Sequence, residues 1–331
     1  MERIIGIDLG TTNSLAATVF DDGPEVIEAS GESSITPSVL SWTDSGWLVG
    51  EKAQESSISN PENTIFSIKR LMGRSLKDLG NSINELPYQI VEAQRQLIKV
   101  KIGEKEYTPQ ELSAEILKKV KMNAESVLGE PVKKAVITVP AYFDDAQRQA
   151  TRDAARFAGL EVARIINEPT AAAIAYGLDE KKEGHIAVYD LGGGTFDISI
   201  LKLSGKIFKV IATHGNTQLG GDDFDKAVAD DIKKKIQKIH PDVQFDDPES
   251  KLLLKKTAES IKKELSFSTE TSYSMELPKT GLTFDGIFKI EEFETLIDPM
   301  IEQTLESCNH VLREANLTVE QIDEVVLVGG S

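Results

Sequence analysis

The stretch IAVYDLGGGTFDISIL, residues 186–201, decides the fold class of this chain. An apolar run leads up to Asp190, three glycines follow at 192–194, and a second apolar run starts at Phe196. This order is typical of two strands joined by a tight turn. Glycine permits sharp backbone turns and lets main-chain N–H groups come close to a ligand. Because successive N–H groups form a concavity that binds anions, the turn is a candidate phosphate-binding hairpin.

The N-terminal stretch IIGIDLGTTNSLAATVF, residues 4–20, has the same pattern. Asp8 and Gly10 take the places of Asp190 and Gly192. A pattern that occurs twice, half a chain apart, predicts two similar lobes. Each acid lies at the end of a strand, where a carboxylate can face a hydrated Mg²⁺ ion, which keeps most of its waters. Two hairpins, one from each lobe, would then hold one polyphosphate between them.

The phosphate loops of the better-known nucleotide-binding folds do not fit this pattern. Both GxGxxG and the Walker loop pass from glycines into a helix, whereas residues 196–203 continue as a strand. The phosphate is therefore expected on a hairpin turn, without help from a helix dipole. The alternative is a glycine-rich turn with a structural role only, and the repeat disfavours it.

The remaining elements alternate between strands and helices. The pattern over 144–159 predicts an amphipathic helix with an Asp cap and a terminal glycine. Pro169 is expected at the first position of a short helix that Gly177 ends. Further strands and helices are predicted at 135–140, 222–239, 251–266, 291–315 and 324–331.

This alternation places the chain in the α/β class, with two lobes. Lobe I is expected at 1–181, with a smaller subdomain over about 37–110. Lobe II is expected at 182–331, with a smaller subdomain over about 221–300. A buried apolar strand is normally followed by a helix that covers its sheet, so the sequence is expected to be a piece of a longer protein.

Composition limits the classes of function. The chain has 331 residues and a net charge of −17, which argues against nucleic acid as a partner because phosphate backbones are bound by Lys and Arg. No stretch has the roughly 18 apolar residues of a membrane span, and the N-terminus has no signal-peptide pattern. Cys308 is the single cysteine, which suits a reducing compartment, so a cytoplasmic location is expected.

Motifs along the whole chain carry a resemblance to a known family. In order, they are IDLGTTNS, KRLMGR, VPAYF, NEPTAAA, DLGGGTFD, LGGDDFD and VGGS. This series resembles the ATPase domain of DnaK-type 70-kDa heat-shock chaperones. The resemblance implies a two-lobed actin-like fold, with a ribonuclease-H-like mixed sheet in each lobe and the nucleotide in the cleft between them. It also implies hydrolysis of ATP to ADP and phosphate, Mg²⁺ and K⁺ as candidate ions, a J-domain co-chaperone, and a client polypeptide held by a separate domain.

The resemblance also assigns roles to residues in these motifs. Asp8 and Asp190 match acids that meet the water shell of the magnesium ion. The residues that match the phosphate hairpins are Gly10, Thr11, Thr12 and Asn13 in the first, and Gly192, Gly193, Gly194 and Thr195 in the second. The residues that match catalytic positions are Lys69, Glu168, Thr195 and Asp197. Without the resemblance, Lys69 and Arg70 are interpreted as a solvated surface pair, and Glu168 as a helix-terminal carboxylate.

Further positions match an adenosine pocket and a coupling device. The pocket positions are Glu259, Lys262, Lys263 and Ser266 on one helix, Gly220 and Gly221 beside the nucleotide, and Gly329, Gly330 and Ser331 on the opposite wall. Spacings of three and four residues place the first set on one helix face. Lys263 replaces an arginine, and lysine stacks less well on adenine, so weaker nucleotide binding is expected. Pro140 and Arg148 match residues that couple nucleotide state to the peptide-binding domain.

Several stretches are closer to the HscA branch of the family than to DnaK, among them SIKRLMGRSL, LPYQ and PAYFDDAQRQ. Proteins of that branch act on iron–sulfur cluster scaffold proteins, so such a scaffold is the expected client. Two other functions remain open from the sequence. One is a regulator that holds ATP without cleaving it, and the other is a small-molecule kinase of the same superfold.

Overall fold

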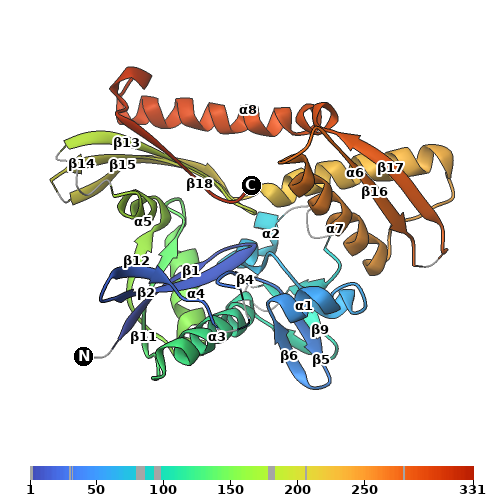
Figure 1. Cartoon of the computed structure of the whole chain (residues 1–331), viewed down its shortest axis with the longest axis horizontal. Coiled ribbons are helices and arrows are strands. Elements are labelled where there is room, and N and C mark those ends of the chain that lie inside the picture. The colour runs from blue at the N-terminus through green and yellow to red at the C-terminus, as the bar shows by residue number, and fades with distance from the viewer. Residues whose placement is uncertain are drawn as a thin grey trace.

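The computed structural model describes residues 3–29, 31, 33–79, 86–92, 98–177, 183–205, 207–278 and 280–331. The expected boundary between the lobes, 181/182, lies outside the described residues. Figure 1 shows two main sheets at one end of the molecule and two smaller groups of strands and helices at the other end. None of the helices in the described part of the chain combines the length and the apolar composition of a membrane span.

The first main sheet contains the N-terminal hairpin. Its strands are β1 (Ile4–Leu9), β2 (Asn13–Phe20), β3 (Gly23–Val26), β4 (Thr36–Pro37), β11 (Lys134–Val139) and β12 (Glu161–Asn167). They lie in the order β12-β11-β1-β2-β3, and β4 pairs with β2. β1 is parallel to β11 and antiparallel to β2, and β2 is antiparallel to β3, so the sheet is mixed.

The second main sheet repeats this topology. Its strands are β13 (Glu183–Leu191), β14 (Phe196–Ser204), β15 (Ile207–Asn216) and β18 (Glu324–Val328). The order β15-β14-β13-β18 has two antiparallel pairs and then a parallel pair. These are the order and directions of β3-β2-β1-β11. The duplication predicted from the two hairpins is therefore confirmed in the strand topology.

Helices cover these sheets and give each half its own core. The helices are α3 (Pro109–Leu128) on β2, α4 (Asp145–Phe157) on β12, α5 (Glu168–Ala175) on β13, and α8 (Ile290–Ala315) on β14 and β15. The apolar cluster of the first sheet draws its buried residues from between 5 and 160. The clusters of the second sheet draw theirs from 173 onward. The two halves can therefore bury their apolar residues independently.

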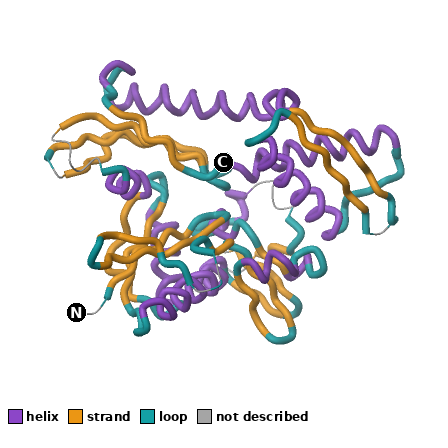
Figure 2. Tube along the Cα trace, in the orientation of Figure 1, coloured by secondary structure: helices purple, strands orange, loops and turns teal. Residues whose placement is uncertain are grey.

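Smaller sheets and helices extend both halves, as Figure 2 shows. Those next to the first sheet are β5 (Leu40–Thr43), β6 (Gly46–Val49), α1 (Glu51–Ser56), η1 (Pro61–Asn63), β7 (Thr64–Ile65), η2 (Ile68–Leu71), α2 (Leu76–Leu79), β8 (Gln89–Glu92), β9 (Ile98–Ile102) and β10 (Lys105–Tyr107). Those next to the second are α6 (Gly221–Ile239), α7 (Pro248–Leu265), β16 (Glu270–Glu276), β17 (Thr283–Lys289) and η6 (Val319–Gln321).

The helices lie within about three residues of their predicted limits, and the largest shift is in α7, which begins at Pro248 and not at 251. Asp144 caps α4, because its carboxylate accepts from Gln147 N over 2.8 Å and the Gln147 side chain accepts from Asp144 N in return. Pro169 is the second residue of α5 and not the first, because the helix begins at Glu168. Pro is still tolerated there, since first-turn N–H groups have no partner within the helix.

The last strand differs from the expectation in its burial. β18 forms as predicted, but Val325 and Leu327 are 62% and 67% exposed, and Val326 is 4% exposed. The strand is thus buried on one face, where Val326 joins the apolar cluster of the second sheet. Apolar composition alone cannot distinguish a strand that is covered on both faces from one covered on a single face.

Removal of the α4 cap is expected to have a modest effect. Asp144→Ala should lower the free energy of unfolding by about 1 kcal/mol, because the Gln147 N–H loses its acceptor. Urea unfolding measures this change. Asp144→Ser is the matched control, and it should stay within a few tenths of a kcal/mol of the wild type because serine also caps. Equal losses in both variants would contradict a capping role.

Candidate functional site

The acids predicted from the hairpins lie at matching places in the two sheets. Asp8 lies near the end of β1, where the hydroxyl of Thr138 in β11 donates to its Oδ1 over 2.9 Å. Asp190 lies near the end of β13, directly opposite Asp197 of β14. The same strand–turn–strand unit therefore places one carboxylate at the corresponding edge of each sheet.

A buried ion pair joins two further predicted residues. Lys69 lies in the 3₁₀ helix η2, and Glu168 is the first residue of α5. Lys69 Nζ lies 2.9 Å from Glu168 Oε1, and Lys69 is 8% exposed. The interpretation of Lys69 as a solvated surface residue is therefore wrong.

Burial and mutual repulsion shift the pKa values of these groups. Burial raises the pKa of Glu168 to about 7, against the opposing effect of Lys69. Burial likewise raises the pKa of Asp190 to about 6, again opposed by Lys69. Burial raises the pKa of Asp197 well above its usual range, and Glu168 and Asp190 add to this effect. Burial lowers the pKa of Lys69, but the surrounding carboxylates outweigh it, so the net shift is upward.

The excess of carboxylates over ammonium groups in this cluster suits a divalent cation. The carboxylates that interact with the Lys69 ammonium are those of Asp8, Glu168, Asp190 and Asp197. Asp197 Oδ1 is buried and has no hydrogen-bond partner among the described residues. A nearby cation favours the charged form of a carboxylate. In the described part of the chain, no three potential metal ligands gather in one place. The carboxylate oxygens of Asp8 and Asp190 are donors that suit Mg²⁺, which is usually bound through one or two carboxylates and keeps several waters.

The structure brings the two predicted hairpins into contact. A Cβ atom at Gly193 would overlap the hydroxyl of Thr12, and one at Gly194 would overlap the side chain of Thr11. The second turn therefore lies directly on the first. A side chain at either glycine would have to displace these threonine side chains, so the absence of a Cβ atom allows the close approach.

Each hairpin is also closed on itself. In the first, a Cβ atom at Gly10 would overlap the carbonyl of Asn13. In the second, Gly192 N donates to Thr195 O over 3.0 Å. Successive main-chain N–H groups in short turns of this kind can bind an anion.

Helix α6 begins beside the second hairpin. Gly221 N donates to Gly192 O over 3.1 Å, and Asp222 N donates to Gly193 O over 2.7 Å. The positive end of α6 therefore lies against the second hairpin, where its first N–H groups donate to hairpin carbonyls. The helix comes from a later segment, after β15, so the residues following the glycines gave no sign of it.

Residues 329–331 also bond to the second hairpin, beside the start of α6. Ser331 N donates to Leu191 O over 3.2 Å, and Ser331 Oγ donates to Gly192 O over 3.1 Å. Gly329 has φ +96°, and a Cβ atom there would overlap the Leu191 carbonyl, so only glycine fits. At Gly330 a Cβ atom would meet open space. The second hairpin, the start of α6 and Ser331 thus form one hydrogen-bonded unit.

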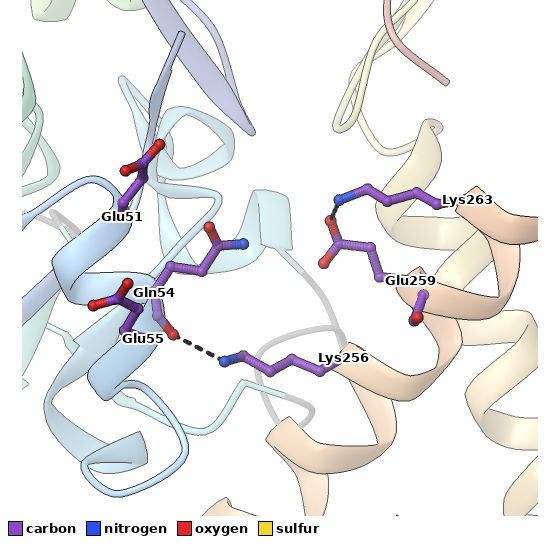
Figure 3. A pocket seen from close by; sticks show the side chains of 7 residues that line it. Glu51, Gln54, Glu55, Lys256, Glu259 and Lys263 are labelled. Atoms are coloured by element: carbon purple, nitrogen blue, oxygen red, sulfur yellow. Dashed lines mark hydrogen bonds and ion pairs between the residues drawn. The ribbon is translucent and has the colours of Figure 1, made fainter. Parts of the chain in front are cut away.

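The α7 residues that are predicted to bind adenosine point in two directions. Glu259 and Lys263 line a cavity of about 470 Å³ between α7 and α1, and Figure 3 shows both side chains directed into it. Lys263 Nζ lies 2.6 Å from Glu259 Oε1. Lys262 turns toward α6, where its Nζ lies 2.7 Å from Asp225 Oδ1. Ser266 donates to the Lys262 carbonyl over 3.4 Å at the helix end.

The two predicted coupling residues touch each other. Arg148 donates through Nε to Phe143 O over 3.0 Å, and through Nη2 to Ala141 O over 3.1 Å and Pro140 O over 3.4 Å. One guanidinium therefore holds the turn that follows β11. Arg148 is therefore not a free surface charge.

Sequence reasoning missed a polar cluster that joins the two halves. Arg70 Nη2 lies 2.5 Å from Asp223 Oδ2, and Lys255 Nζ lies 2.5 Å from Asp222 Oδ1. Ser67 Oγ donates to Asp222 Oδ2 over 2.5 Å. The motif LGGDDFD contains both acids, and acids are usual in the first turn of a helix. Nothing local in the sequence identifies their partners.

The geometry agrees with the comparison to known families. A family model described as Hsp70 protein matches residues 4–331. The match spans both hairpins, the Lys69–Glu168 pair and the second half of the molecule, and it confirms the predicted two-lobed actin-like α/β fold. The chain belongs to the Hsp70 family.

Proposed function

We propose that this chain binds ATP between its two halves and hydrolyses it to ADP and phosphate, as the ATPase domain of a molecular chaperone. Hsp70 proteins are chaperones whose ATPase domains bind ATP or ADP with Mg²⁺. The observation that carries the proposal is the buried Lys69–Glu168 pair, which interacts with Asp8 and Asp190 from corresponding strands. Phosphoryl transfer depends on positioned charge more than on covalent chemistry, and this cluster supplies such charge.

The hairpins and Lys69 would hold the phosphates. Main-chain N–H groups of both turns donate to phosphate oxygens, and the Thr195 hydroxyl lies in the second turn among them. When bound, Mg²⁺ neutralises charge on the phosphate oxygens. Asp8 and Asp190 would hold the ion by accepting hydrogen bonds from water bound to it. The Lys69 ammonium donates to the terminal phosphate and stabilises the charge that develops there.

Glu168 and Asp197 would hold the attacking water. A carboxyl group with a pKa of about 7, as burial gives Glu168, can accept a proton near neutral pH. Asp197 Oδ1, which is unpaired among the described residues, offers a second acceptor to the same water. Proton removal and water orientation then fall to this chain's own carboxylates.

We further propose the division into lobe I (1–181, with a subdomain over about 37–110) and lobe II (182–331, with a subdomain over about 221–300). Separate apolar cores, one formed by residues up to 160 and the others by residues from 173 onward, support a division into two lobes. The adenosine would lie between α7 and the 329–331 segment, beside Gly220 and Gly221. K⁺ is a second candidate ion beside the phosphates.

Coupling to a peptide-binding domain is proposed for Pro140 and Arg148, because their hydrogen bond joins the turn after β11 to α4. A J-domain co-chaperone and a client polypeptide are the proposed partners, in the cytoplasm. The HscA-like stretches favour an iron–sulfur scaffold protein as client. Capture of a purified scaffold protein by the whole chaperone, with release on ATP addition, tests the assignment to the HscA branch. A failure to bind would contradict that assignment.

Single-turnover hydrolysis of radiolabelled ATP with Mg²⁺ tests the proposed function. Release of phosphate by the purified chain, accelerated by a J-domain protein, is the expected result. Tight ATP binding without turnover, even with the J-domain protein, would instead support a nucleotide-holding regulator. Transfer of the label to a sugar or polyol from a panel would support a kinase.

An arginine in place of Lys263 is expected to tighten nucleotide binding. Arg is planar and stacks on an aromatic base better than Lys, so Lys263→Arg should lower the Kd for ATP about two- to fivefold. Isothermal titration measures the change. Lys256→Arg is the control, because Lys256 lines the same cavity but donates to the Gln54 carbonyl on α1, and its Kd should not change. Equal Kd values for Lys263→Arg and the wild type would contradict the adenine contact.

A further inference from the structure

Arg70 is the side chain in η2 that reaches across to the second half of the molecule. Its Nε donates to Gly194 O over 2.9 Å, and its Nη2 lies 2.5 Å from Asp223 Oδ2. Its Nη1 also donates to Asp223 Oδ1, over 3.4 Å. One guanidinium therefore holds the second phosphate hairpin and the first turn of α6 together. Only a planar group with several donors can make these bonds simultaneously.

The two groups that Arg70 holds already form one rigid unit. The α6 N–H groups of Gly221 and Asp222 donate to the hairpin carbonyls of Gly192 and Gly193. Arg70 thus contacts this unit at two points. Any movement of the hairpin relative to η2 must stretch or break these contacts.

Arg70 and Lys69 are neighbours in the same short 3₁₀ helix but point in different directions. A 3₁₀ helix has three residues per turn, so successive side chains diverge by about 120°. Lys69 accordingly reaches Glu168, while Arg70 reaches Asp223. Because the two residues share a single helical turn, the position of Arg70 fixes the backbone from which Lys69 extends.

A second contact holds the start of this turn. Ser67 has φ 54° and ψ 27°, a left-handed conformation that non-glycine residues adopt rarely. Its hydroxyl donates to Asp222, whose other carboxylate oxygen pairs with Lys255. The turn that carries Lys69 is therefore held to α6 at both Ser67 and Arg70.

We propose that Arg70 is a positioning residue for ATP hydrolysis: its bonds to Asp223 and the Gly194 carbonyl align the Lys69 ammonium with the second phosphate hairpin while the two halves are closed. This inference rests on the proposed ATPase function. Opening of the cleft would break the Arg70 bonds and withdraw Lys69 from the phosphate. Closure of the cleft would therefore also align Lys69 for catalysis.

Arg70→Lys tests the inference, because lysine keeps the charge but cannot bond Asp223 and the Gly194 carbonyl together. Single-turnover hydrolysis should slow at least about tenfold, since small displacements of a catalytic group have effects of this size. The Kd for MgATP should stay within about threefold, because the hairpin N–H groups still bind the phosphates. Arg74→Lys is the matched control. Arg74 also crosses to the other half, donating to Thr217 Oγ1 over 2.6 Å, but it does not hold the hairpin, and its variant should hydrolyse at the wild-type rate.

Asp223→Asn provides an independent variant if Arg70→Lys does not fold. It should slow hydrolysis to a similar degree, and the double variant should be no slower than either single one, because the two residues act through one contact. Wild-type rates in Arg70→Lys and Asp223→Asn would overturn the inference. Equal slowing by Arg74→Lys, or a rise in Kd that matches the fall in rate, would overturn it as well. A wild-type chain that does not hydrolyse ATP at all would overturn the proposed function itself and the inference with it.

Discussion

Replacement of Lys69 by alanine is expected to slow single-turnover hydrolysis of ATP by about 100- to 1,000-fold, the usual loss when one donor to a developing negative charge is removed. Lys69 is 8% exposed and its ammonium lies among acidic side chains, so the variant loses a buried positive charge from the site. ATP binding should weaken less than about tenfold, because the phosphates keep the N–H groups of both hairpins. A stopped time course with labelled ATP, together with a binding titration, separates the two effects.

The same variant is expected to remain folded. Lys69 holds the pKa of Glu168 down, so its removal lets the buried carboxyl take up a proton at neutral pH. A neutral buried acid avoids the large destabilisation of an unpaired charge. Lys256→Ala is the control, since Lys256 also bonds to a distant segment, from α7 to the Gln54 carbonyl of α1, but it lines the cavity between those helices and is not part of the acid cluster. A rate in Lys69→Ala equal to the wild type would remove Lys69 from the mechanism.

The sequence predicts the parts of this molecule whose signals are local. Each hairpin is specified by an apolar run, an acid and small residues within a single stretch, and the duplicated topology follows from finding it twice. The limits of α4 follow from Asp144 and Gly159, because caps act within one turn of a helix. In each case, both partners of the interaction lie close together in the sequence.

Contacts between distant segments are the part that the sequence does not reveal. Arg70 and Asp223 lie 153 residues apart in the sequence. Each residue alone is typical of an ordinary surface charge. The approach of α6 to the second hairpin is hidden for the same reason. Helical spacing predicts a common face for Glu259, Lys262 and Lys263, but Lys262 turns away to Asp225 of α6, a partner that depends on how α6 packs against α7.

Substitution of alanine for Gly220 is expected to weaken ATP binding by about 100-fold, because a displacement of roughly 1 Å at a binding site can have an effect of this size. A Cβ atom at Gly220 would lie 2.5 Å from Gly192 O, 2.7 Å from Gly194 N and 2.8 Å from Gly193 C. These are main-chain atoms of the second hairpin and cannot move aside by a change of rotamer. The hairpin or the start of α6 must therefore shift. Either shift lengthens the bonds that Gly221 N and Asp222 N make to the hairpin carbonyls.

Stability should fall in the same Gly220→Ala variant by about 1–3 kcal/mol, the usual effect of forcing a methyl group into a packed site. Gly6→Ala is the matched control, since a Cβ atom at Gly6 in β1 would meet Ala17 O at 3.8 Å, an ordinary contact. Gly6 lies two residues from Asp8, so the control also lies close to the acid cluster. Loss of ATP affinity in Gly220→Ala but not in Gly6→Ala would tie nucleotide binding to the fit between α6 and the second hairpin. Wild-type affinity in both variants would mean that the hairpin binds phosphate without the support of α6.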